Sequence, residues 1–76
     1  MNTKQTAICE ALVKLGHAEK LNYNTTKYRV FTRKDGTFYF VGKAGSLRYG
    51  RTVGESFSAS PETIRTIILK AKKVTK

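Results

Sequence analysis

The chain has 76 residues, a formal net charge of +10 and one cysteine, Cys9. This length predicts a single small basic domain over residues 1–76, with a core near the lower limit for independent folding. One cysteine excludes an internal disulfide and favours a reducing compartment, so we expect a cytoplasmic protein. The apolar runs are too short for a membrane span, so we expect no membrane partner.

Two stretches have the apolar periodicity of amphipathic helices. The first stripe begins at Ile8 and predicts a helix over residues 3–15. The second follows Ser60, a typical N-cap residue, and Pro61, which fits the first helical position, and it predicts a helix over residues 61–73.

The stretch between the helices alternates aromatic or β-branched residues with basic ones over residues 27–52, a period of two that predicts strands. Asp35 and Gly36 mark a three-residue hairpin loop, which pairs Phe31 with Tyr39. A third strand is expected after a second turn, and a short edge strand before the second helix. The predicted fold is α+β: a three-stranded antiparallel sheet, four-stranded with the edge strand, flanked by an N-terminal and a C-terminal helix, in the order α-β-β-β-(β)-α.

The strand period also sorts side chains onto two faces of the sheet. One face, apolar and expected to lie under a helix, holds Tyr28, Val30, Phe38 and Phe40. The other, basic and aromatic, holds Arg29, Phe31, Arg33, Tyr39 and Val41. An even-length second loop places Leu47 and Tyr49 beside Phe40 and leaves Arg48 on the basic face, whereas a three-residue loop reverses this. We favour the even loop because it completes one apolar face.

Acid–base or metal chemistry requires titratable side chains that converge on one site. The five carboxylates are predicted beside turns or on exposed helix faces, and none is placed near His17, the only histidine. The stretch from Gly42 to Ser46 has the letters of a phosphate-binding loop but neither its spacing nor its following helix, and we interpret it as a plain turn. We therefore predict no enzymatic activity, no cofactor and no metal site.

The basic residues are densest on the predicted sheet, where residues 27–54 carry a net charge of +6. Lysine and arginine neutralise phosphates, and exposed aromatic rings stack unpaired bases, so this pattern predicts a module that binds DNA or RNA. Either a single strand on the aromatic rings or a duplex groove read by arginine fits the pattern. The predicted nucleic-acid-binding residues are Lys27, Arg29, Phe31, Arg33, Lys34, Tyr39, Lys43, Arg48 and Arg51.

The run from Phe38 to Ser58 resembles small uncharacterised proteins encoded by tailed phages and prophages. The shared pattern is Gly-Lys-x-Gly-x-Leu-Arg-x-Gly-Arg-Thr followed by Ser, and its residues in this chain are Gly42, Lys43, Gly45, Leu47, Arg48, Gly50, Arg51 and Thr52. The resemblance implies a viral protein in the host cell cytoplasm and supplies no biochemical activity.

A second hypothesis is a protein-interaction factor. Aromatic residues and arginine are enriched in protein interfaces, so the basic and aromatic face suits a small phage inhibitor or adaptor that binds an acidic host protein. It also suits a sheet-mediated homodimer, and both monomer and homodimer stay open. Alternatively, Phe31, Tyr39 and Val41 form a second hydrophobic surface under helix 3–15 or another subunit, with the arginines around its rim.

Overall fold

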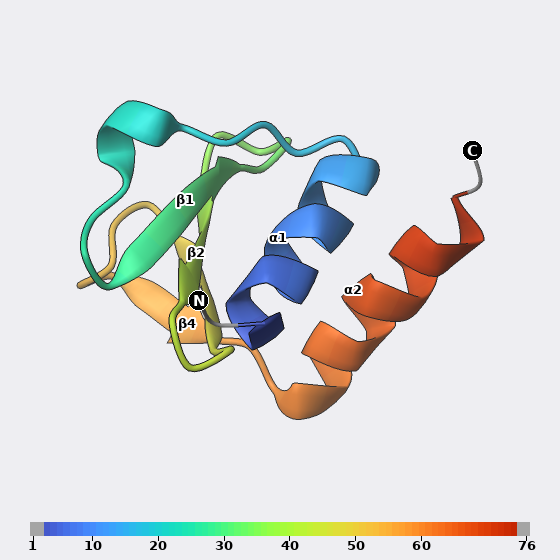
Figure 1. Ribbon diagram of the computed structural model, residues 1–76. Helices are drawn as coiled ribbons and strands as arrows, with labels where there is room; N and C mark the ends of the chain where they lie inside the picture. The colour runs from blue at the N-terminus through green and yellow to red at the C-terminus, as the bar shows by residue number, and fades with distance from the viewer. Residues whose placement is uncertain (1–2, 75–76) are drawn as a thin grey trace.

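Two α-helices and four strands follow one another in the order α-β-β-β-β-α in the computed structural model, which describes residues 3–74 (Figure 1). Their bounds are α1 Thr3–Lys14, β1 Tyr28–Thr32, β2 Phe38–Gly42, β3 Leu47–Gly50, β4 Ser56–Ser58 and α2 Pro61–Lys73, with a short 3-10 helix, η1 Leu21–Tyr23, before β1. The strands form one antiparallel sheet in the order β1-β2-β3-β4. This is the predicted α+β fold with the edge strand present.

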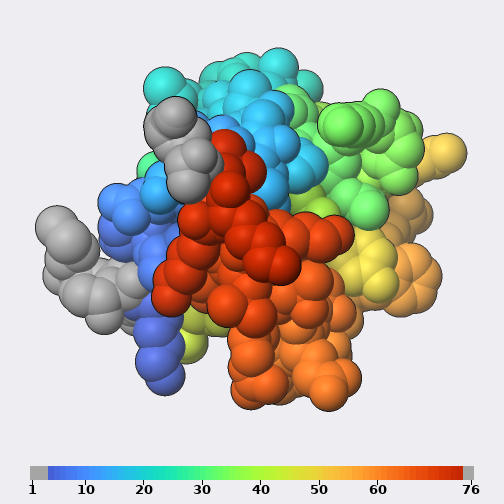
Figure 2. Space-filling view, turned by 90° about the vertical axis from the view of Figure 1, so that its right-hand side faces the viewer, coloured from blue at the N-terminus to red at the C-terminus, as the bar shows by residue number. Residues whose placement is uncertain are grey.

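Both predicted helices form, and both lie on the same side of the sheet (Figure 1). The Ser60 hydroxyl accepts a hydrogen bond of 3.2 Å from the Thr63 N–H and caps the start of α2, as expected. Figure 2, which faces α2, shows it alongside α1, with side chains of the β1–β2 hairpin and of β3 and β4 on its other flank. Because α2 packs mainly on α1, the two helices together cover only one face of the sheet.

The first hairpin has the predicted loop and register. The Arg33 N–H donates to the Thr37 carbonyl at 2.9 Å across a three-residue loop, and Gly36 closes that loop with a φ of +88°. Phe31 pairs with Tyr39 as expected.

The second hairpin has the same three-residue loop, so the prediction of an even loop is wrong. The Gly42 N–H donates to the Ser46 carbonyl at 2.9 Å, and Gly45 closes the loop with a φ of +88°. A positive φ at the last loop position is the conformation in which a type I turn ends in a bulge, and glycine adopts it without steric cost. Leu47 therefore pairs with Val41.

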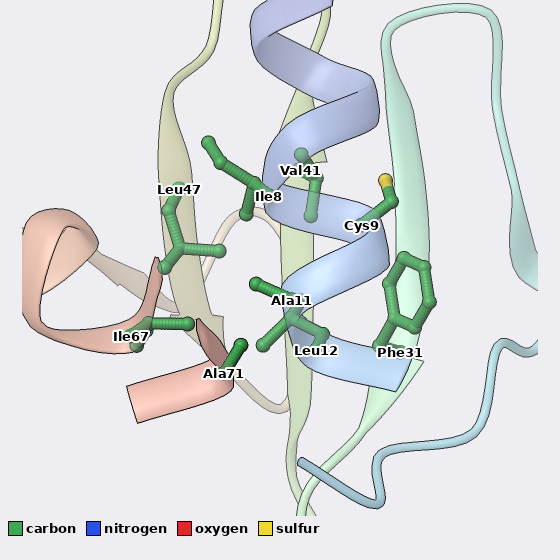
Figure 3. Close-up of a cluster of buried hydrophobic side chains, with 9 residues drawn as sticks. All are labelled: Ile8, Cys9, Ala11, Leu12, Phe31, Val41, Leu47, Ile67 and Ala71. Atoms are coloured by element: carbon green, nitrogen blue, oxygen red, sulfur yellow. The ribbon is translucent and has the colours of Figure 1, made fainter. Parts of the chain in front are cut away.

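This register reverses the predicted exposure of the two sheet faces. Phe31, Val41 and Leu47 share the helix-side face and are buried there under α1 and α2 (Figure 3). The buried cluster consists of Ile8, Cys9, Ala11, Leu12, Phe31, Val41, Leu47, Ile67 and Ala71. The prediction that the helices cover the face of Phe40 is wrong, because that face holds Arg48 in the observed register whereas the opposite face gains the aliphatic Leu47. Phe31 and Val41 lie under helix α1, in agreement with the alternative prediction of a hydrophobic surface covered by helix 3–15.

The outer edge of β1 is covered by the connection that follows α1. The Lys20 N–H donates to the Val30 carbonyl and the Thr32 N–H donates to the Ala18 carbonyl, both at 2.8 Å. The Asn24 side chain then accepts a 2.7 Å hydrogen bond from the Val30 N–H. These bonds satisfy edge groups that would otherwise be open to another strand, and they hold η1 against the face that the helices leave open (Figure 1).

The two loop glycines form a matched pair for testing the hairpin geometry. Alanine at Gly36 places its Cβ in open space, so only the left-handed backbone is penalised, and Gly36→Ala is expected to cost about 1 kcal/mol in free energy of unfolding. Alanine at Gly45 has the same φ and places its Cβ 2.8 Å from the Lys4 Cβ on α1, so Gly45→Ala is expected to cost about 2–3 kcal/mol. Urea unfolding of both variants measures the difference, and equal costs would contradict the close packing of this loop on α1.

Candidate nucleic-acid interface

The face of the sheet away from the helices carries a continuous row of aromatic rings, which we call the open face. Its residues are Tyr28, Val30, Phe38, Phe40 and Arg48. Tyr28 and Phe38 each lie 6.4 Å from Phe40 between ring centroids, and Tyr23 of η1 lies 5.4 Å from Phe38. The row therefore extends from the sheet onto the neighbouring 3-10 helix.

The rings of the open face differ in how much surface they offer to a ligand. Phe40 is buried at the centre of the row, and Tyr28 and Phe38 on either side of it are half-buried. The Tyr23 side chain is 50 % exposed, with the Lys20 ammonium 5.5 Å from its ring centroid. A planar ligand therefore has three accessible rings on this face, with a cation beside one of them.

Arg48 lies on the open face and is held flat against β4. Its Nε donates to the Ser56 hydroxyl at 2.6 Å, its Nη2 to the Ser56 carbonyl at 2.9 Å and its Nη1 to the Ser58 hydroxyl at 2.8 Å. None of the carboxylates in residues 3–74 forms an ion pair with Arg48. The positive charge is thus fixed in position and remains available to an anion.

Three more predicted residues lie in exposed connections around the sheet. Lys27 precedes β1, Lys43 belongs to the loop between β2 and β3, and Arg51 follows β3. Lys27 and Lys43 are neighbours across the strands, because Tyr28 pairs with Gly42. Lys34 is exposed at the tip of the β1–β2 hairpin. None of these four cations forms an ion pair within residues 3–74.

Arg29 was predicted to bind nucleic acid, and the structure places it in a fixed ion pair. Its Nε and Nη2 donate to the two carboxylate oxygens of Glu19, both at 2.9 Å. The Arg29 side chain is 38 % exposed, and its guanidinium also lies 5.9 Å from the ring centroid of Phe31. The bidentate pair ties the connection after α1 to β1, so Arg29 contributes to the fold.

Phe31 and Tyr39 do not form the exposed stacking surface that their alternation predicted. Phe31 is 0 % exposed beneath α1, so its assignment to an exposed binding face is wrong. Tyr39 is half-buried on the helix side, with the His17 ring edge-on at 5.1 Å. The Arg33 guanidinium lies 5.0 Å from the ring centroids of both Tyr39 and Tyr49. These residues therefore form a second, separate cluster on the helix side.

The accessible rings of the open face that the sequence analysis did not select are Tyr23, Tyr28 and Phe38. Tyr28 and Phe38 were placed on the face expected to lie under a helix, and Tyr23 lies in a connector that has no periodic pattern. The signal that could have found the two strand residues is the glycine at position 45: a three-residue loop closed by Gly45 places Leu47 beside Val41 and leaves Tyr28 and Phe38 on the face of Arg48.

No protein-family model, curated protein or solved structure matches this chain. In the described part of the chain, no three His, Cys, Asp or Glu side chains are grouped so that they could hold a metal ion. Neither helix within residues 3–74 has the length and apolar character needed to cross a bilayer.

The Glu19–Arg29 ion pair makes stability depend on pH in a defined direction. The hydrogen bonds from Arg29 hold the pKa of Glu19 below its ordinary value of 4.5. A lowered pKa means that the stabilisation is present above the unfolded-state pKa and is lost as the pH falls through the folded-state value. Glu19→Gln is therefore expected to lower the free energy of unfolding by about 1 kcal/mol at neutral pH, and by less in acid.

Urea unfolding at neutral pH and at about pH 3 measures this difference. The matched control is Glu10→Gln, at an exposed glutamate that forms no ion pair within residues 3–74. A control effect as large as that of Glu19→Gln would show that the ion pair is not the cause.

Proposed function

We propose that the protein binds single-stranded DNA or RNA on the open face and that it carries out no catalysis. The observation that carries this proposal is the row formed by Tyr23, Phe38, Phe40 and Tyr28, which neither α-helix covers and which has lysines at one end that form no ion pair within residues 3–74. Every base has a π-face, so stacking on aromatic rings tolerates any sequence and contributes about 1–3 kcal/mol per base. Four-stranded sheets with exposed aromatic residues bind about two or three bases in this way.

The cations complement the rings because a strand carries one negative charge per nucleotide. Arg48 lies within the open face, and Lys27 and Lys43 lie at one end of it. Contacts from these residues to phosphates would release counterions and supply affinity that does not depend on base sequence. The net charge of +10 adds long-range attraction of the polyanion.

A single strand fits the open face better than a duplex does. Reading guanine in the major groove requires an arginine whose paired N–H groups are free to donate to the base edge. Arg48 donates three of its five N–H groups to β4, which holds the guanidinium along the sheet and leaves one N–H on each of Nη1 and Nη2 for a phosphate. The accessible rings of Tyr23, Tyr28 and Phe38, in contrast, need unstacked bases.

A protein partner is the second candidate function, and one observation favours it. Leu21 of η1 is 73 % exposed next to Tyr23, which gives the rim of the open face an apolar character. Aromatic and arginine side chains together with such a rim suit an acidic protein surface or a second copy of this chain. A phage origin, implied by the resemblance over Phe38 to Ser58, is compatible with both candidates and remains part of the proposal.

Fluorescence anisotropy with labelled single-stranded DNA, single-stranded RNA and duplex DNA, each over a salt series, tests the proposal. We expect binding to the single strands to fall with salt, with a slope of about −0.7 per phosphate contacted. Tyr23→Ala should weaken binding about tenfold by removing one stacking ring. The matched control is Phe57→Ala, which removes a 68 % exposed ring from the helix-side face and should leave affinity within about twofold.

Two results would count against this function. If duplex DNA binds as tightly as single strands and Tyr23→Ala changes nothing, then stacking on the open face is not the mode of binding. If no nucleic acid binds at physiological salt, while sedimentation shows a dimer that Tyr23→Ala dissociates, then the open face is a protein interface.

A further inference from the structure

A pocket of about 220 Å³ lies at the end of the open face where β2 turns into β3. It is lined by Lys27, Tyr28, Gly42, Lys43, Ala44 and Ser46. Tyr28 also belongs to the aromatic row, so the pocket adjoins the stacking surface. None of the lining residues is acidic, and two of them are lysines.

Gly42 is the lining residue at which an added side chain would disturb the pocket. Gly42 pairs with Tyr28 across β1 and faces Ser46 across the loop. A Cβ at Gly42 would collide with the Ser46 hydroxyl and lie 3.5 Å from the Tyr28 ring. Unlike Gly36 and Gly45, Gly42 does not have a positive φ, so the backbone does not require glycine. Glycine at this position therefore leaves room for the Ser46 hydroxyl and the Tyr28 ring, whereas the two loop glycines adopt a left-handed backbone.

Several groups around this pocket are hydrogen-bond donors that have no protein partner within residues 3–74. The ammonium groups of Lys27 and Lys43 form no ion pair within residues 3–74. In the same part of the chain, the Ser46 hydroxyl and the backbone N–H groups of Lys43 and Ala44 donate no hydrogen bond. Clustered backbone N–H groups and cations in a concave loop suit a tetrahedral oxyanion.

We propose that this pocket binds a phosphate group. On a bound strand, this is the phosphate beside the base that stacks on Tyr28, so this part of the inference rests on the proposed function. Both a terminal phosphate and an internal phosphodiester have the required chemistry. Lys27 and Lys43 neutralise the phosphate, the loop N–H groups and the Ser46 hydroxyl donate to its oxygens, and Tyr28 aligns the adjoining base.

The first experiment uses inorganic phosphate and needs no nucleic acid. We follow the backbone amide signals of the protein by NMR during titration with phosphate, with chloride at equal ionic strength as the reference. The Lys43 and Ala44 signals should shift with phosphate only. In Gly42→Ala, whose added methyl group displaces the Ser46 hydroxyl and crowds the Tyr28 ring, the phosphate-specific shifts should be lost. The Ser46 hydroxyl can rotate away from the methyl group, so the fold should remain intact, and the unshifted signals of α1 and α2 check this.

The second experiment compares oligonucleotides of about eight residues that carry a 5′-phosphate, a 3′-phosphate or only hydroxyl ends. About tenfold tighter binding of one phosphorylated form, lost in Gly42→Ala, assigns the pocket to a terminal phosphate. Equal binding of all three, with a salt slope reduced by about 0.7 in the Lys27→Gln/Lys43→Gln variant, assigns it to an internal phosphate. The charge-matched control is Lys72→Gln/Lys73→Gln on α2, which should preserve both properties.

The two proposals fail in different ways. Phosphate shifts that match those of chloride, or that survive in Gly42→Ala, overturn the phosphate pocket even if oligonucleotides bind. Phosphate-specific shifts in a protein that binds no oligonucleotide preserve the pocket and overturn the proposed function.

Discussion

The geometry of the two hairpin loops determines what each face of this sheet can do. Side chains alternate along a strand, so a loop one residue longer or shorter exchanges every side chain of the next strand between the faces. Gly36 and Gly45 close loops of the same length and the same φ of +88°, which sets Phe31, Val41 and Leu47 on one face. That face then has the aliphatic surface on which α1 and α2 pack, and the rest of the fold follows from it.

Once the helices are placed, the second apolar face is covered only in part: Val30 and Phe40 are buried there, whereas Tyr28 and Phe38 are half-buried. The α2 helix packs mainly on α1 rather than on the other side of the sheet, and only the short helix η1 reaches the open face (Figure 1). The rings of Tyr28, Phe38 and Phe40 contact one another there, which removes part of their surface from water. An apolar surface that stays partly open in this way is typical of interaction sites.

Local chemistry was sufficient to predict the elements and not sufficient to predict the faces. The cap at Ser60, the turn at Asp35-Gly36 and the apolar stripes fixed both helices and the first hairpin, because each signal acts within a few residues. The second loop offered two interpretations of nearly equal local quality, and the choice between them depends on packing against α1, which is distant in sequence. The wrong length for the second loop also made the site prediction wrong, because it assigned Phe31 to the surface and Tyr28 to the core.

The acidic residues explain why fewer arginines are available to a ligand than the sequence predicted. Only five carboxylates are available to the chain, and two of them, Glu19 and Asp35, pair with Arg29 and Arg33. Arginine is the better residue for such fixed pairs because its planar fork donates two parallel hydrogen bonds, as Arg29 does to Glu19. Lysine gains less from one geometry, and the exposed lysines in the loops stay unpaired within residues 3–74. Arg29, Arg33 and Arg48 are therefore held in place by partners within the sheet and its connections, whereas Arg51 and the loop lysines form no ion pair within residues 3–74 and keep mobile charges at the ends of the strands.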